Sequence, residues 1–211
     1  MSTVTRHILS DEILDKIMIL FWESGYSNVS IDDLIKVTGF NRAALYKNFG
    51  GKHGLFVAML YRFRDKVVVE ATRPISDPAN GIDGIVQFFR QFSQQDLHQM
   101  SSRGCFMIAT ASNLPVHDAE VAAVIEEFIN HLRGLFGKCM RYMQAEQRLS
   151  SDVEVEVVAD FLVGSLVGLM TLIRSNVDQR MLNNHIKGIL AFLASLPARR
   201  ESFRGTLHLV S

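Results

Sequence analysis

The stretch GYSNVSIDDLIKVTGFNRAALYKNFGGKHGLF, residues 25–56, decides the fold, because glycines and polar caps divide it into two short helices. Ser30 and Asp33 stand at the spacing of a capping box, and apolar residues follow on one side of the segment. Gly39 can adopt the left-handed conformation that ends such a helix. The pattern predicts a short amphipathic helix over residues 31–38.

A second short helix follows almost at once. Asn41 is a favourable N-cap residue for a helix over residues 42–49, which Gly50 and Gly51 end. Two short helices joined by about three residues cannot lie antiparallel, so they must cross steeply. The sequence therefore predicts a helix-turn-helix over about residues 30–49.

Outward from this motif, apolar residues recur at spacings of three and four along almost the whole chain, and only four prolines interrupt them. Ser10 and Gly25 are expected to bound a first helix of about fourteen residues. The fold class is therefore predicted to be all-α. The remaining helices are predicted over residues 52–71, 82–99, 104–113, 117–146, 152–175 and 178–196, and the tail after Pro197 has little periodicity.

The segment RPISDPANG, residues 73–81, holds two prolines, an asparagine and a glycine, and it predicts a boundary between two domains. An N-terminal domain over residues 1–71 contains the helix-turn-helix. A larger helical domain covers residues 72–211.

The charge of the chain is distributed unevenly. Its 22 basic and 22 acidic residues cancel, so no global field attracts nucleic acid or a membrane. Residues 36–66 nevertheless hold seven Lys and Arg and one Asp, a local charge of +6, and residues 39–56 contain no acidic residue. A basic segment around a helix-turn-helix is expected to bind a polyanion.

The second helix of a helix-turn-helix enters the DNA major groove, while flanking groups bind phosphates. Leu45 and Phe49, four residues apart, are expected to face inward, which leaves the other side of this helix to DNA. Arg42 can reach a base edge or a phosphate, and Tyr46 can donate its hydroxyl to a phosphate. The predicted DNA-binding residues are Ser30, Asn41, Arg42, Ala43, Tyr46, Lys47 and Lys52.

The run over residues 25–56 resembles the DNA-binding signature of TetR/AcrR-type bacterial transcriptional regulators. It shows a Gly-Tyr pair, the Ser30 cap, an apolar helix, a glycine turn, L-Y-x-x-F, a lysine and L-F in register. Two positions depart from the family pattern, because His53 stands where an acidic residue is usual and Asn48 where His or Tyr is common. We expect His53 to alter a local phosphate contact without abolishing DNA binding.

The resemblance further implies that the C-terminal domain receives a small-molecule effector and forms a homodimer. Dimers in this family are built mainly from the last two long helices, here about residues 152–196. Gly164, Ser165 and Gly168 would permit close helix packing there. A two-fold dimer implies a pseudo-palindromic operator in double-stranded DNA.

An aromatic and Met-rich set of residues in the C-terminal domain has two interpretations. It forms an ordinary core, or it lines a deformable pocket for an apolar or aromatic effector. The candidate pocket residues are Phe88, Phe89, Phe92, Cys105, Phe106, Phe136 and Met140.

Cys105 also suggests an alternative. It stands at the N-terminus of the helix predicted over residues 104–113, beside Arg103, an arrangement that favours a thiolate. The segment resembles the Gly-Cys segment of a TetR subgroup that includes electrophile- and oxidant-responsive repressors. A ligand-responsive repressor, a repressor controlled by the thiol of Cys105, and a helical enzyme or carrier of a small molecule thus remain three hypotheses.

Other functional classes find little support in the sequence. Cys105 and Cys139 lack zinc-ligand spacing, the histidines show no metal spacing, and no nucleophile motif occurs, so no metal, cofactor or enzyme activity is expected. The apolar run over residues 157–173 contains Asp160 and is short for a membrane span, which predicts a buried helix. The N-terminus becomes charged early, which predicts a cytoplasmic protein.

Overall fold

The computed structural model describes residues 9–93, 103–113 and 118–198. Within these ranges every regular element is a helix. The predicted all-α fold class is therefore confirmed.

Four helices begin the described chain, and polar side chains cap the first three where the sequence predicts. They are α1 (Asp11–Ser24), α2 (Ile31–Thr38), α3 (Arg42–Phe49) and α4 (Lys52–Phe63). Ser10 caps α1 by accepting a hydrogen bond from the Ile13 N–H at 3.3 Å, and Ser30 and Asp33 form the reciprocal capping box of α2. Gly39 ends α2 with a φ of 68°, the left-handed conformation. The short turn between α2 and α3 thus follows from local signals.

The predicted helix over residues 52–71 is not uniform. After α4 the chain passes through a π-helical turn, Arg64–Val68, into α5 (Val69–Ala71). The Thr72 hydroxyl closes this segment by donating to the carbonyl oxygen of Val68 at 2.8 Å. The predicted boundary segment also contains α6 (Arg73–Ser76) and a 3-10 turn (Pro78–Asn80), because proline fits the first turn of a helix.

Five further helices complete the described chain. They are α7 (Gly81–Arg90), which a 3-10 turn (Gln91–Ser93) extends, α8 (Phe106–Ala111), α9 (Ala119–Ala145), α10 (Val155–Arg174) and α11 (Gln179–Ser195). Their described ends agree with the predicted helices to within a few residues. Predicted helical residues 94–99 and 117, and the tail after residue 198, lie outside the described residues.

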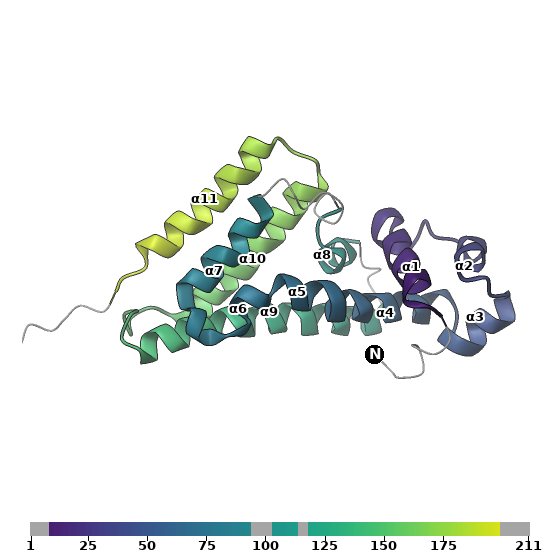
Figure 1. Ribbon diagram of the computed structural model, residues 1–211, viewed down its shortest axis with the longest axis horizontal. Coiled ribbons are helices and arrows are strands. Elements are labelled where there is room, and N and C mark those ends of the chain that lie inside the picture. The colour runs from purple at the N-terminus through teal and green to yellow at the C-terminus, as the bar shows by residue number, and fades with distance from the viewer. Residues whose placement is uncertain (1–8, 94–102, 114–117, 199–211) are drawn as a thin grey trace, which may run out of the picture.

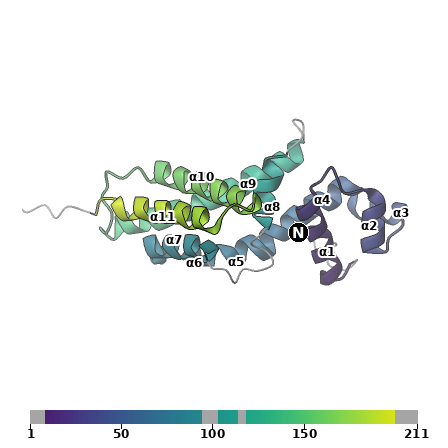
Figure 2. The ribbon, with the colours of Figure 1, turned by 90° about the horizontal axis from the view of Figure 1, so that it is seen from above.

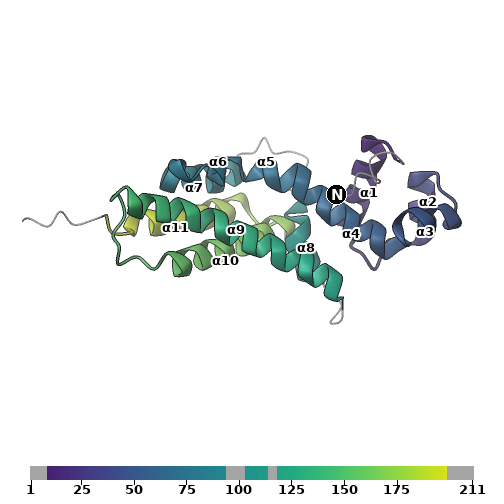
Figure 3. The ribbon, with the colours of Figure 1, turned by 90° about the horizontal axis from the view of Figure 1, so that it is seen from below.

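The helices form an elongated molecule with α1, α2 and α3 at one end (Figure 1). The α4–α5 segment runs along the molecule and joins this end to the remaining helices (Figure 1). The 27-residue α9 lies beside it and packs against α7 and α10 (Figure 3). Helices α10 and α11 lie side by side (Figure 2). The short α8 packs against α4, α9 and α10.

Buried aromatic rings connect the N-terminal helices to the rest of the core. Trp22 of α1 packs edge-on against Phe63 of α4, with 4.9 Å between ring centroids. Phe106 of α8 packs edge-on against Phe56 and Phe63 of α4, at 5.7 and 5.8 Å. Because burial of each such side chain stabilises the fold by roughly 1.5–3 kcal/mol, these contacts hold α8 against α1 and α4.

Candidate functional site

Helix α3 has one buried side and one side that faces solvent. Asn41 Oδ1 accepts a hydrogen bond from the Ala44 N–H at 2.8 Å and fixes the first turn. Leu45 is fully buried, and the Phe49 ring packs against Phe40 with 6.4 Å between centroids. Both residues face inward, as their spacing predicts.

The opposite side of α3 presents Arg42, Ala43, Tyr46 and Lys47 to solvent. The Tyr46 ring is 52% exposed, which is unusual for a large aromatic side chain. Neither Arg42 nor Lys47 forms an ion pair with any residue that the structure describes. Their charges are therefore available to a phosphate or to a guanine edge in the major groove.

Two predicted contacts beside α3 are already engaged within the protein. The Lys52 ammonium lies over the Tyr26 ring, 4.3 Å from its centroid, and burial lowers the pKa of this ammonium. Ser30 is exposed, but its hydroxyl donates to Asp33 Oδ2 at 2.6 Å. A phosphate at either side chain would compete with an existing contact.

Carboxylates of neighbouring helices bind three cations of the basic segment. Arg62 is only 2% exposed and pairs with Asp11 and Asp15 of α1, and Lys66 Nζ lies 3.2 Å from Asp15 Oδ2. Arg64 Nη1 donates to a glutamate of α9 at 3.3 Å. These three cations connect helices, so the local charge counted from the sequence overstates the charge that faces DNA.

His53 joins α4 to the start of α9. Its Nε2 lies 3.0 Å from Asp118 Oδ2, and its Nδ1 lies 3.6 Å from Glu120 Oε2. Asp118 also caps α9 by accepting from the Val121 N–H at 3.1 Å. The expected effect of His53 on a phosphate is untested, but its nearest polar partners belong to α9.

Gly54 permits the close packing of α3 against α4. A Cβ at this position would overlap the carbonyl oxygen of Phe49, whereas a Cβ at Gly134 in α9 would meet no atom within 4 Å. We expect Gly54→Ala to lower the free energy of unfolding by about 2 kcal/mol or more, since backbone must move. The matched Gly134→Ala should raise it by roughly 0.5–1 kcal/mol.

Urea denaturation of both variants measures this difference. Equal midpoints for Gly54→Ala and the wild type would contradict the proposed close approach of the two helices.

A mostly apolar cavity of about 360 Å³ lies among the helices of the C-terminal part, and Trp22 of α1 and Phe63 of α4 form part of its wall. Of the candidate pocket residues, Phe88, Phe92 and Cys105 line it. Phe106 lines a different cavity, between α1, α8 and α10. Phe89, Phe136 and Met140 are buried in the core and are not among the lining residues of either cavity.

The sequence did not reveal several residues of the apolar cavity. Trp22 of α1, Val67 of the π-helical turn, Leu132 of α9 and Met170 of α10 also line it. They come from segments far apart in the sequence, and each fits an ordinary apolar helix side. The signals that did indicate a cavity wall were the aromatic residues of α7 and the 3-10 turn after it, and Cys105 before α8.

The predicted activation of Cys105 is wrong in direction. Burial raises the pKa of this thiol to about 11. Arg103, the cation expected to stabilise the thiolate, instead donates from Nε to Glu23 Oε1 at 2.6 Å. The helix that follows Cys105, α8, has only six residues, so its dipole adds little stabilisation. Whether Cys105 senses electrophiles remains a prediction, but its environment does not favour the thiolate.

The capped α2–α3 pair and the exposed basic side of α3 define a helix-turn-helix DNA-binding protein. Residues 13–59 match the family model described as bacterial regulatory proteins, tetR family. Residues 81–189, more than half of the chain, match the tetracyclin repressor-like C-terminal domain. The chain therefore belongs to the TetR family, and it is a DNA-binding transcriptional regulator.

Relatives and solved structures agree with this assignment. The chain is 26% identical over 153 residues to the HTH-type transcriptional repressor ComR of Escherichia coli (strain K12), covering 72% of this chain and 73% of ComR. It is 22% identical over 182 residues to the uncharacterized HTH-type transcriptional regulator YezE of Bacillus subtilis (strain 168), covering 86% and 94%. A solved structure of a cysteine mutant of the TetR family regulator CifR, complexed with 26-bp operator DNA, has the same fold, with a TM-score of 0.75. The two sequences are 22% identical, and the match covers 91% of this chain and 99% of the CifR chain.

Proposed function

We propose that the protein is a ligand-responsive repressor that binds a pseudo-palindromic operator as a homodimer. The observation that carries this proposal is the exposed side of α3, where Arg42, Tyr46 and Lys47 have no acidic neighbour within residues 39–56. ComR is named a repressor, and the CifR structure holds operator DNA, which supports the same role here. A dimer would place two α3 helices in successive major grooves.

The two functions are assigned to two parts of the chain. Residues 1–71 form the DNA-binding domain, and residues 72–211 form the regulatory and dimerisation domain. The two family matches, over residues 13–59 and 81–189, lie on either side of this boundary and support it.

The homodimer forms through about residues 152–196. Val157, Phe161 and Met181 on α10 and α11 are 59%, 45% and 52% exposed. Val157 and Phe161, four residues apart, lie on one side of α10, and such an exposed apolar patch marks an interaction surface. Gly164 lies on the exposed side of α10, where the absence of a side chain permits close approach of a second copy.

The effector occupies the apolar cavity. Its walls are hydrocarbon and aromatic at Phe63, Phe88 and Leu132, so it favours an apolar or aromatic molecule. The π-helical turn after α4 provides part of the wall, so an effector in this cavity would lie at the end of α4, the helix that packs against α3. An effector with higher affinity for a conformation in which the two α3 helices are wrongly spaced would release the operator.

Helix α10 also bears on the location of the protein. Among the described residues it is the one helix long and apolar enough to cross a membrane by length and composition, and 44% of its apolar window is buried in the fold. A core helix of a soluble protein passes the same test, and the exposed remainder fits a dimer contact. We therefore propose that the protein is cytoplasmic. The relatives are named transcriptional regulators, which supports a regulator without enzymatic activity.

Operator binding tests the proposal. A fluorescent DNA fragment from upstream of the gene that encodes the protein should bind with an anisotropy change that saturates at one dimer per site. Addition of a matching apolar effector should reverse the change. Equal affinity for this fragment and for shuffled DNA at the same salt concentration would refute a sequence-specific regulator.

The ligand-responsive and thiol-based hypotheses predict different alkylation rates for Cys105, and the cysteines of a ligand-responsive repressor are expected to react slowly. At pH 8, a pKa of about 11 in place of the ordinary 9.0 leaves Cys105 and Cys139 with about 100-fold less thiolate than the unfolded chain has. We expect iodoacetamide to alkylate the folded protein at least that much more slowly than the protein in urea. The rate should rise with pH up to about 11.

Mass spectrometry of the two cysteine-containing peptides measures both rates. Alkylation of folded Cys105 at the unfolded rate, with Cys139 protected, would instead favour control through the thiol of Cys105.

A further inference from the structure

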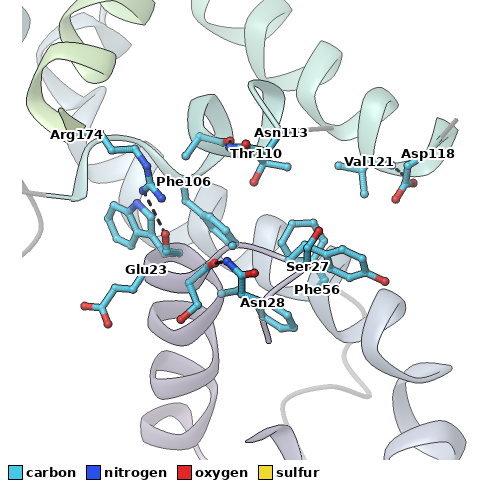
Figure 4. A pocket seen from close by; sticks show the side chains of 16 residues that line it. Glu23, Ser27, Asn28, Phe56, Phe106, Thr110, Asn113, Asp118, Val121 and Arg174 are labelled. Atoms are coloured by element: carbon cyan, nitrogen blue, oxygen red, sulfur yellow. Dashed lines mark hydrogen bonds between the residues drawn. The ribbon is translucent and has the colours of Figure 1, made fainter. Parts of the chain in front are cut away.

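A second cavity, of about 380 Å³, lies at the junction between the N-terminal helices and the rest of the molecule (Figure 4). We call it the junction cavity. Its walls come from the end of α1 and the loop after it, from α4, from α8, and from the ends of α9 and α10. In Figure 4, Thr110 and Asn113 approach it from α8 and its C-terminal end, Asn28 approaches from the opposite side, and Phe106 lies between them. Any occupant would touch both parts of the protein.

A hydrogen-bonded wall separates this cavity from the apolar one. Trp22 lines both cavities, and its Nε1–H donates to the carbonyl oxygen of Arg103 at 3.2 Å. Arg174 Nη1 donates to the carbonyl oxygens of Trp22 at 3.2 Å and Arg103 at 3.1 Å. The two cavities are therefore neighbours with different walls, and the junction cavity is considerably more polar.

The polar groups of the junction cavity include hydrogen-bond acceptors that the fold does not use. Asn28 Nδ2 donates to the carbonyl oxygen of Ser24, and Asn113 Nδ2 donates to that of Ala109, both at 2.9 Å. Because only the NH₂ group can donate, these bonds fix both carboxamide orientations. Neither Oδ1 atom accepts a hydrogen bond from any residue in the described part of the chain, and the Thr110 hydroxyl has no partner there either.

Aromatic rings form the apolar part of the same walls. Phe21, Tyr26, Phe56 and Phe106 line the junction cavity, and Tyr26 and Phe56 lie 4.9 Å apart between centroids. Such rings favour a planar aromatic guest through edge and face contacts. Glu23, Asp118 and Arg174 also line it, but Glu23 pairs with Arg103 and Asp118 with His53, so the walls offer no unpaired carboxylate and favour a neutral guest.

We propose that the junction cavity is a second ligand site, for a small, neutral aromatic molecule that carries hydroxyl or amino donors. The ring packs among Phe56, Phe106 and Tyr26, and its donors bind the Oδ1 atoms of Asn28 and Asn113. Such a ligand contacts α4 and the loop after α1 together with α8, so it holds the N-terminal helices in one position relative to the C-terminal ones. The proposal that the ligand binds depends only on the cavity, whereas an effect of the ligand on operator binding rests on the proposed function.

The test compares 2-naphthol with naphthalene, which has the same rings but no donor. Isothermal titration calorimetry and quenching of Trp22, the only tryptophan, report binding without DNA. We expect the wild type to bind 2-naphthol severalfold more tightly than naphthalene, since a hydrogen bond to the exposed carboxamides of Asn28 and Asn113 replaces one to water. Thr110→Val and the double variant Asn28→Leu/Asn113→Leu should reduce this preference severalfold.

Matched cavity-filling variants locate the ligand. Ala109 lines the junction cavity and not the apolar one, whereas Ala71 lines the apolar cavity alone. Ala109→Phe should abolish 2-naphthol binding, and Ala71→Phe should preserve it, with circular dichroism as the check on folding. Loss of binding in Ala71→Phe alone, or an absent preference for 2-naphthol in the wild type, would overturn the proposal.

The Thr110→Val variant serves if Ala109→Phe fails to fold, because it removes a hydroxyl without changing volume. Undiminished preference for 2-naphthol in both Thr110→Val and the double asparagine variant would also overturn the proposal. Operator anisotropy with and without 2-naphthol then measures coupling to DNA. A protein that binds 2-naphthol but no operator would refute the proposed function and leave the ligand site intact.

Discussion

Phe161→Arg is expected to convert the protein from a dimer to a monomer and to abolish operator binding at nanomolar concentrations. The Phe161 ring is 45% exposed and lies 4.3 Å from the Phe192 ring, between centroids, so the two rings present a joint aromatic surface on α10 and α11. In a two-fold interface each substitution occurs twice. The loss of two aromatic anchors, at roughly 2 kcal/mol each, weakens the dimer about 10³-fold, and two facing guanidinium groups weaken it further.

The monomer itself should stay folded, because Phe161 is not part of the buried core. Sedimentation velocity gives the oligomeric state, circular dichroism gives the fold, and anisotropy gives operator affinity. Val69→Arg is a matched control, since Val69 is 58% exposed but lies on α5, outside the proposed interface. A Phe161→Arg protein that sediments as a dimer and binds the operator with wild-type affinity would contradict the assignment of the interface to α10 and α11.

The sequence predicts best those parts of the fold that local chemistry determines. The S-x-x-D capping box, the Asn41 cap and the left-handed glycines each act over four residues or fewer, so helix starts and the α2–α3 turn follow from neighbouring residues alone. The π-helical turn, Arg64–Val68, was not predicted, because its residues continue the apolar spacing of α4. A smooth periodicity cannot reveal one additional residue in a turn.

The site is predictable only where its residues are neighbours in the chain. Arg42, Tyr46 and Lys47 lie on one side of a short helix, and their exposure follows from the burial of Leu45 opposite them. The cavities instead combine distant segments, such as Trp22 with Arg174, whose hydrogen bond joins residues 152 positions apart. The positive charge that the N-terminal domain presents to DNA could not be counted from the sequence either, because the carboxylates of α1 that neutralise Arg62 are remote in sequence.

Lys47→Ala should weaken operator binding and reduce its dependence on salt. If each protomer contacts one phosphate through Lys47, the slope of log affinity against log salt should fall in magnitude by about 1.8, since each contact contributes about 0.9. At 0.1 M salt this corresponds to a loss of affinity of roughly 10- to 60-fold. Lys47 is a sharper test than Lys52, because Lys52 also packs over the Tyr26 ring and its replacement would affect stability.

Two companion variants separate charge from hydrogen bonding at this surface. Tyr46→Phe removes only a neutral donor from an exposed ring, so affinity should fall severalfold while the salt slope stays constant. Lys138→Ala removes the same charge as Lys47→Ala from an exposed position on α9, and it should change neither quantity appreciably. If Lys138→Ala lowers the slope as much as Lys47→Ala does, the effect belongs to the net charge of the protein, and α3 does not bind the phosphates. If only Lys47→Ala lowers it, the lysine of α3 lies against the DNA backbone, because counterion release responds to contact and not to distant charge.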